Sequence, residues 1–213
     1  NGIPLLPGGL KPPLSNNDGT KHLLDEQIGD AGNFTDASVE SFRKAINTNL
    51  TQSISCRRLL WSSEHHHLGR ALAAVRLLDI LHRLCTEQAL GKSHRILVQA
   101  HGQAGLVLAL ASNMLCPSPI TGRPKLLNIL NAYAEQTHQS ELAEAVRRVE
   151  SLLTAATLLN GVALDIVTFG MPVRYGWDSS GIGKLLHVVN HRNLRTDGKN
   201  WLAKMELPQI TME

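Results

Sequence analysis

The residue types that could do chemistry in this chain lie close together in one short segment, Ala100–Gly105, with the sequence AHGQAG. It places a titratable side chain, His101, and an amide side chain, Gln103, on either side of Gly102. An apolar, β-rich run precedes the segment at 96–98, and an Ala/Leu-rich helical run follows it. A sharp turn from a strand into a helix lifts its central residue above the sheet, where a nucleophile would meet a carbonyl group. The central residue here is Gly102, which has no atom able to attack.

This segment resembles the nucleophile elbow of α/β-hydrolases, in which five positions read Gly-x-Ser-x-Gly. The positions two before and two after the nucleophile must be small so that strand and helix can approach, and here they are Ala100 and Ala104. Gly102 stands where the family carries serine, and glycine adopts the positive φ of an elbow easily. The resemblance implies an α/β-hydrolase-like domain related to lipases and esterases. The missing serine implies that ester hydrolysis is impaired in this form.

Two further segments extend the resemblance over roughly residues 57–195. The segment 167–175, VTFGMPVRY, is similar to the strand and Gly-x-Pro element that follows the elbow in lipase-like members. The segment 61–64, WSSE, and the Arg- and Leu-rich helix after it look like the strand and helix that precede the elbow.

The resemblance also implies catalytic roles. In the family the backbone N–H after the nucleophile stabilises the oxyanion, and this role falls to Gln103. The triad order of nucleophile, acid and histidine makes the acid Asp178 or Asp197. The base would be His187 or His191, and no histidine follows Asp197.

His101, Tyr175 and Trp177 are predicted to shape an acyl pocket beside the turn. Each has an alternative structural role. His101 could donate a hydrogen bond inside the fold, and the two aromatic side chains could anchor their loop without any ligand.

Two other functions stay open. A non-catalytic module could bind a small acyl ligand or a protein partner over Gly102. A strand-Gly-helix unit could also begin a nucleotide-binding β-α-β domain, although the third glycine of G-x-G-x-x-G and a Walker-type lysine are absent.

No cofactor and no metal ion are expected. The side chains of His65, His66 and His67 would point about 100° apart on a helix and could not all reach one ion, so we interpret them as a solvated helix start. The cysteines are odd in number and widely spaced, which argues against a disulfide framework and predicts buried apolar side chains; they are Cys56, Cys85 and Cys116.

The chemistry must be positioned by alternating strands and helices. The predicted strands lie at 57–61, 95–99, 163–169 and 185–190. Helices are predicted from Thr35 or Ser38 to about Asn47, from Leu68 to about Leu90, and twice within 123–160. This order predicts an α/β fold, with a mostly parallel sheet and helices on both faces.

The 213 residues are 43% hydrophobic, which suits one domain over 1–213, with an irregular N-terminal segment, 1–56, and a core, 57–195. The net charge is +3, and the basic residues form no run of five, so no nucleic-acid partner is expected. The most apolar window falls short of about 18 uninterrupted apolar residues, so no membrane span is predicted.

The predicted partner is a small acyl or ester ligand, and the oligomeric state is open. The chain begins Asn-Gly-Ile-Pro, without an initiator Met or a secretion signal, and we expect a processed or partial product.

Overall fold

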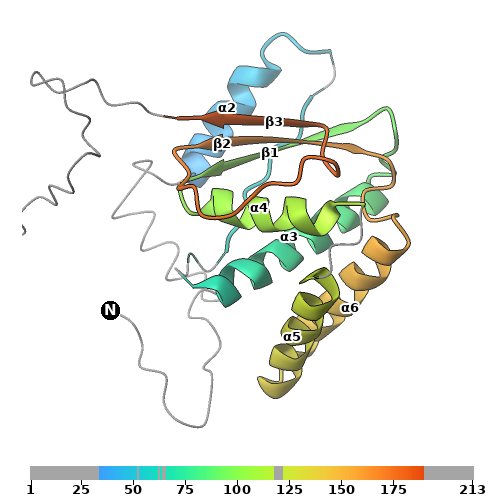
Figure 1. The fold of residues 1–213 in the computed structure, drawn as a ribbon. Coiled ribbons are helices and arrows are strands. Elements are labelled where there is room, and N and C mark those ends of the chain that lie inside the picture. Colours follow the sequence, from blue (N-terminus) through green and yellow to red (C-terminus); the bar gives the residue numbers. More distant parts are fainter. Residues whose placement is uncertain (1–33, 52, 62, 64–65, 118–121, 190–213) are drawn as a thin grey trace, which may run out of the picture.

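The computed structural model describes residues 34–51, 53–61, 63, 66–117 and 122–189. These residues form a small parallel sheet and a layer of helices (Figure 1). The elements are α2 (Asp36–Asn47), α3 (His67–Glu87), β1 (Arg95–His101), α4 (Ala104–Leu115), α5 (Gly122–Gln136), α6 (Ser140–Thr154), β2 (Ala163–Phe169) and β3 (Lys184–Val188).

The three strands pair in the order β1-β2-β3, and both pairs are parallel. In the register of the sheet, Ile166 of β2 lies between Val98 of β1 and Leu185 of β3. Parallel neighbours need a long crossover, and helices α4, α5 and α6 provide the one between β1 and β2. The predicted α/β class with a parallel sheet is therefore confirmed at this coarse level.

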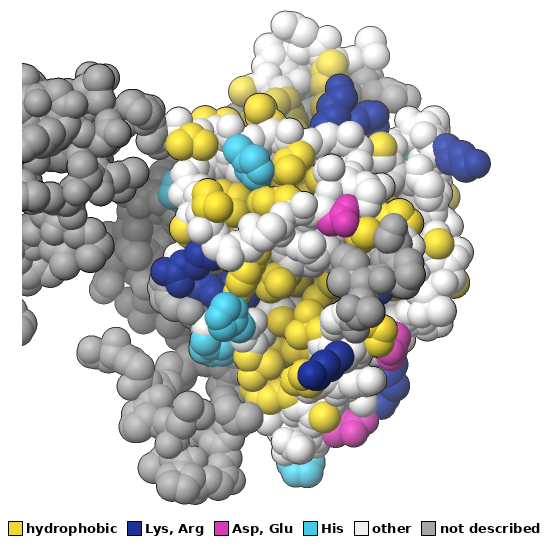
Figure 2. All heavy atoms as spheres, in the orientation of Figure 1, with side chains coloured by type: hydrophobic (Ala, Val, Ile, Leu, Met, Phe, Trp, Pro, Cys, Tyr) yellow, Lys and Arg dark blue, Asp and Glu magenta, His cyan; other side chains and the backbone are white. Residues whose placement is uncertain are grey.

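The core extends from the sheet across α4 to α3 and from there to α5 and α6. Side chains of β2 alternate in burial, and Leu164, Ile166 and Thr168 face the helices. Helix α3 packs against α4 and α6, and α5 packs against α6. Figure 2 shows hydrophobic side chains gathered on this side of the molecule, over α3 and α4.

The opposite sheet face is not covered in the same way. Leu97 is 52% exposed and Leu186 is 57% exposed. Helix α2 stands apart from the helical layer, beyond the sheet (Figure 1), and has no buried residue. Within the described residues, the predicted packing of helices on both faces is therefore seen on one face only.

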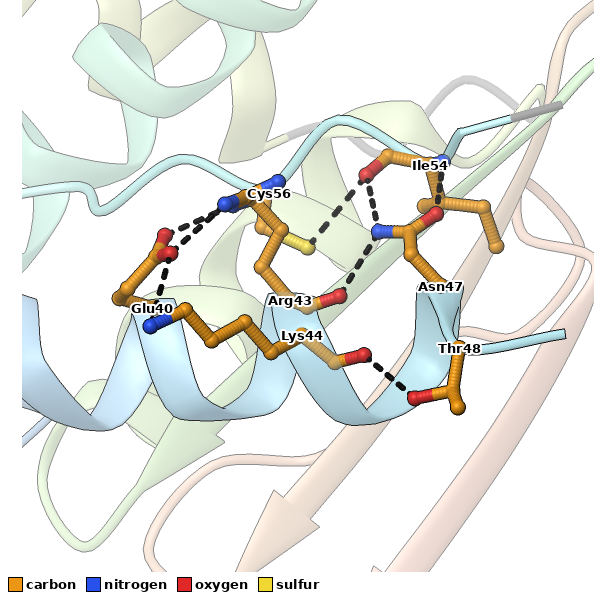
Figure 3. A network of polar contacts seen from close by, with 7 residues as sticks. All are labelled: Glu40, Arg43, Lys44, Asn47, Thr48, Ile54 and Cys56. Atoms are coloured by element: carbon orange, nitrogen blue, oxygen red, sulfur yellow. Dashed lines mark hydrogen bonds and ion pairs between the residues drawn. The ribbon is translucent and has the colours of Figure 1, made fainter. Parts of the chain in front are cut away.

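Helix α2 lies within 1–56, the segment that we expected to be irregular. It forms at the place where the capping pattern predicted a helix, from Thr35 or Ser38 to about Asn47. Its N-cap is Thr35, whose hydroxyl accepts a hydrogen bond from the Ser38 N–H at 3.1 Å. Its C-terminal end is tied to the following segment, because the Asn47 amide bonds both backbone groups of Ile54, at 2.6 and 3.0 Å (Figure 3).

The strand predicted at 57–61 is wrong, since these residues have no regular secondary structure. Their apolar side chains line a groove along α3 with Leu72 and Ile80, and do not enter the sheet. Arg58 pairs with Asp36 at 3.5 Å. A short apolar run can pack on a helix as well as in a sheet, and its composition does not distinguish the two.

Two helices end earlier than predicted. Helix α3 ends at Glu87 because Ala89 takes a positive φ of 49° and the Leu90 N–H bonds the Cys85 carbonyl at 2.8 Å. Helix α6, the second helix predicted within 123–160, ends at Thr154, and Ala156 just beyond it takes a positive φ of 55°. The left-handed residue that stops each helix is alanine and not the glycine that usually marks such an end.

Two of the three cysteines are buried as predicted, Cys85 and Cys116, whereas Cys56 is half-buried. No helix among the described residues has the length and apolar character needed to cross a bilayer.

Candidate functional site

The predicted strand-turn-helix is present at Gly102. Strand β1 continues to His101, Gly102 has a φ of +54°, and α4 begins at Ala104. The Gly102 N–H donates to the Phe169 carbonyl at 2.9 Å, which extends the pairing with β2. The Gly105 N–H then donates back to the Gly102 carbonyl at 3.1 Å. The chain thus passes from sheet to helix within two residues, at the carboxyl end of a parallel strand.

The two glycines of this turn have different surroundings. A Cβ at Gly102 would have no atom within 4 Å, so the residue faces open space and only its positive φ favours glycine. A Cβ at Gly105 would lie 2.6 Å from the Met171 Cβ. Gly105 therefore lets α4 approach the segment that follows β2, a role that the sequence did not predict.

Gln103, the expected oxyanion donor, directly follows the turn. It is the N-cap of α4, but its side chain does not cap the helix. The Gln103 Oε1 accepts a hydrogen bond from the Arg70 Nη2 at 3.0 Å. The side chain is thus directed toward α3.

Arg70 joins the turn to the loop between β2 and β3. It is only 1% exposed, and its Nη1 donates to the Tyr175 hydroxyl at 3.2 Å. The guanidinium carbon lies 6.0 Å from the centroid of the Tyr175 ring. The same hydroxyl lies 2.6 Å from the His67 Nδ1. We call the four residues His67, Arg70, Gln103 and Tyr175 the Arg70 network.

Sequence reasoning missed Arg70, although a signal was present. Arg70 stands on the apolar stripe of its helix, at helical spacing from the buried Ala74, Leu77 and Leu81. A charged residue in a buried stripe needs polar partners inside the fold. An arginine at this position therefore predicts a buried polar network.

Asp178, one candidate for the acid, is not brought to the turn. Its N–H lies 3.4 Å from the Ser112 Oγ, and its carboxylate accepts the Ser180 N–H at 2.9 Å and the Ser180 hydroxyl. Hydrogen bonds from the Cys116 thiol and from Ser180 lower the pKa of this carboxyl. Ser112 and Cys116 belong to the carboxyl end of α4, and a 12-residue helix is about 18 Å long. Asp178 and Gly102 are thus at opposite ends of α4.

His187, one candidate for the base, lies on β3 in a different cluster. Its Nδ1 is 2.6 Å from the Oγ1 of the buried Thr168, the neighbouring residue on β2. Trp177 packs edge-on against His187, with ring centroids 5.1 Å apart. In the sheet register, Thr168 separates His187 from Ala100 of β1. Trp177 therefore belongs with His187, and the structure does not join either to the Arg70 network.

His101 ends β1, half-buried, and its Nε2 lies 4.0 Å from where a Cβ on Gly170 would be. Asp197 and His191 lie outside the described residues.

The described histidines at the start of α3 have separate partners. The His66 Nδ1 accepts the Gly69 N–H at 3.0 Å and caps the helix, whereas His67 contacts Tyr175. His65 lies outside the described residues. Across the described ranges, no group of three or more His, Cys, Asp or Glu residues is arranged to hold a metal ion.

Comparisons with known proteins do not place the chain in a family. No family model, no curated protein and no solved structure matches it.

Proposed function

We propose that this chain is an α/β-hydrolase-like protein related to serine carboxylic-ester hydrolases, whose site over Gly102 receives the acyl part of an ester. The observation that carries the proposal is the turn itself. Gly102 combines a positive φ with open space, at the carboxyl end of a parallel strand and directly before a helix. A nucleophile elbow needs the same combination, because its side chain must clear both the sheet and the helix.

The residues around the turn would bind and orient an ester more readily than cleave it. The Gln103 N–H would donate to the carbonyl oxygen, as the resemblance implies. Tyr175 would border the acyl group, held in place by Arg70. With no hydroxyl at 102, only a small residual hydrolysis from oxyanion donors and binding is expected.

Restoring the hydroxyl tests this proposal. We expect Gly102→Ser to release p-nitrophenolate from p-nitrophenyl butyrate in a slow first phase approaching one per chain, because the serine Oγ becomes acylated without activation by Asp178 or His187. The matched control is Gly102→Ala, which adds the same Cβ without the hydroxyl. The alanine variant should not be acylated at position 102, because its methyl group cannot attack the ester.

A folded Gly102→Ser chain that releases no more p-nitrophenolate than Gly102→Ala would contradict the proposal. Mass spectrometry of the intact chain gives a second measurement, since a butyryl group should be found on the serine variant alone. Saturable binding of a nucleotide at millimolar concentration, with no acylation, would favour a nucleotide-binding domain in its place.

A further inference from the structure

The Arg70 network joins three parts of the chain that are distant in sequence. Arg70 comes from the first turns of α3, Gln103 follows the turn after β1, and Tyr175 lies in the loop between β2 and β3. A single guanidinium contacts both of the others, through different nitrogens. Its side chain is almost completely buried, so these hydrogen bonds are sheltered from water.

We infer that Arg70 is the positioning residue of the site over Gly102, holding the side chains of Gln103 and Tyr175 in one fixed arrangement. The inference rests on the proposed function where it concerns the ester site. The link that Arg70 makes between Gln103 and Tyr175 does not depend on that function. In this role Arg70 does not bind the ester itself. It acts through Gln103 and Tyr175.

The geometry of the guanidinium supports this role. Its donors form a rigid planar fork, so bonds from Nη1 and Nη2 fix the direction of one acceptor relative to the other. Lysine would offer a single ammonium at the end of a flexible chain and could not reproduce both contacts in the same way.

Each partner would be less restrained without Arg70. The Gln103 side chain makes no capping bond to α4, so its contact with Arg70 orients it. Tyr175 lies in a segment without regular secondary structure, between Gly170 at a φ of +56° and β3. Its hydroxyl is held by Arg70 and by His67. Loss of Arg70 should therefore loosen both the turn and the loop.

Hydrogen exchange of the full chain separates positioning from general stabilisation. We expect Arg70→Met to raise amide exchange at least about tenfold in the peptides covering 101–106 and 171–177, with little change in α6. Arg70→Lys should give an intermediate increase. The matched control is Arg83→Met, which removes an arginine from the same helix without touching the Arg70 network. It should leave both peptides unchanged.

Kinetics in the Gly102→Ser background give the second measurement. Adding Arg70→Met should lower the acylation rate constant by about 10- to 100-fold, the order expected from misplacing a site by about 1 Å. The ester concentration for half-saturation should change much less. If Gly102→Ser itself shows no acylation, the proposed function fails, and the exchange measurement still decides the role of Arg70.

Unchanged exchange in both peptides, or an increase spread evenly over the chain, would overturn the inference. If Arg70→Met does not fold, Tyr175→Phe replaces it, because this variant keeps the ring and removes one acceptor. It should raise exchange in the loop and, through Arg70, in the turn. An effect confined to the loop would then contradict the coupling.

Discussion

Replacing Arg83 and Arg148 together with methionine is expected to lower the free energy of unfolding by about 3–5 kcal/mol. Both arginines donate to Asp79, each with a contact of 2.6 Å, and this carboxylate is 1% exposed at the packing of α3 against α6. The double variant leaves the charge buried without the two cations that bond to it. Each single variant should cost much less, since the other arginine remains.

The pH dependence should also change. Burial alone would raise the pKa of Asp79, but hydrogen bonds from Arg148 and then Arg83 outweigh it and lower the pKa below 3.8. In the native chain, ionised Asp79 with Arg83 and Arg148 therefore stabilises the fold at pH values above 3.8. This contribution is lost as the pH falls through the lowered pKa of Asp79. In the double variant only burial remains, which favours the protonated form. The difference in stability between the two chains should shrink as pH falls from 7 to 4.

Urea unfolding at pH 7 and pH 4 measures both effects. The control is Arg147→Met, which removes from the same helix an exposed partner of Glu135 at 3.5 Å. Exposed pairs contribute about 0–1 kcal/mol, so this variant should unfold almost like the native chain. A double variant as stable as the control would show that Asp79 is not held by these arginines.

Replacing Gly105 with alanine is expected to lower the free energy of unfolding by about 1–3 kcal/mol, the usual cost of overpacking. The added Cβ would lie 2.6 Å from the Met171 Cβ, which a change of rotamer cannot move. The matched comparison is Gly102→Ala, three positions earlier in the same segment. There the Cβ has free space, and only the positive φ costs energy, about 1–2 kcal/mol.

A double-mutant cycle with Met171→Gly tests the cause of the Gly105 effect. In the Met171→Gly background, the loss in free energy of unfolding caused by Gly105→Ala should be smaller by at least about 1 kcal/mol, because substitutions at contacting residues are not additive. Thermal or urea unfolding of the four chains gives the coupling energy. Additive effects would mean that the strain lies elsewhere than in this contact.

The strands and helices of the core were predictable because their signals are local. The strands predicted at 95–99 and 163–169 became β1, which extends to His101, and β2. The strand expected at 57–61 failed since its apolar side chains found a partner in α3, and no local signal reports which surface a short run will meet.

The turn at Gly102 was likewise visible in the sequence, while the surroundings of the site were not. Small residues and glycines within six positions are enough to predict a sharp strand-to-helix turn. The position of Asp178 depends on where the β2–β3 loop runs relative to α4, where it contacts Ser112, whereas His187 is kept from Gly102 by the strand order, with β2 between β1 and β3.

The sequence by itself determined the parallel α/β alternation and the conformation of Gly102, because both arise from periodicity and backbone sterics over a few residues. Only the tertiary structure decided that Arg70, and none of the expected acid or base candidates among the described residues, reaches the turn. The reason is that α3, the turn and the β2–β3 loop are more than thirty residues apart in the chain and meet only when the core packs.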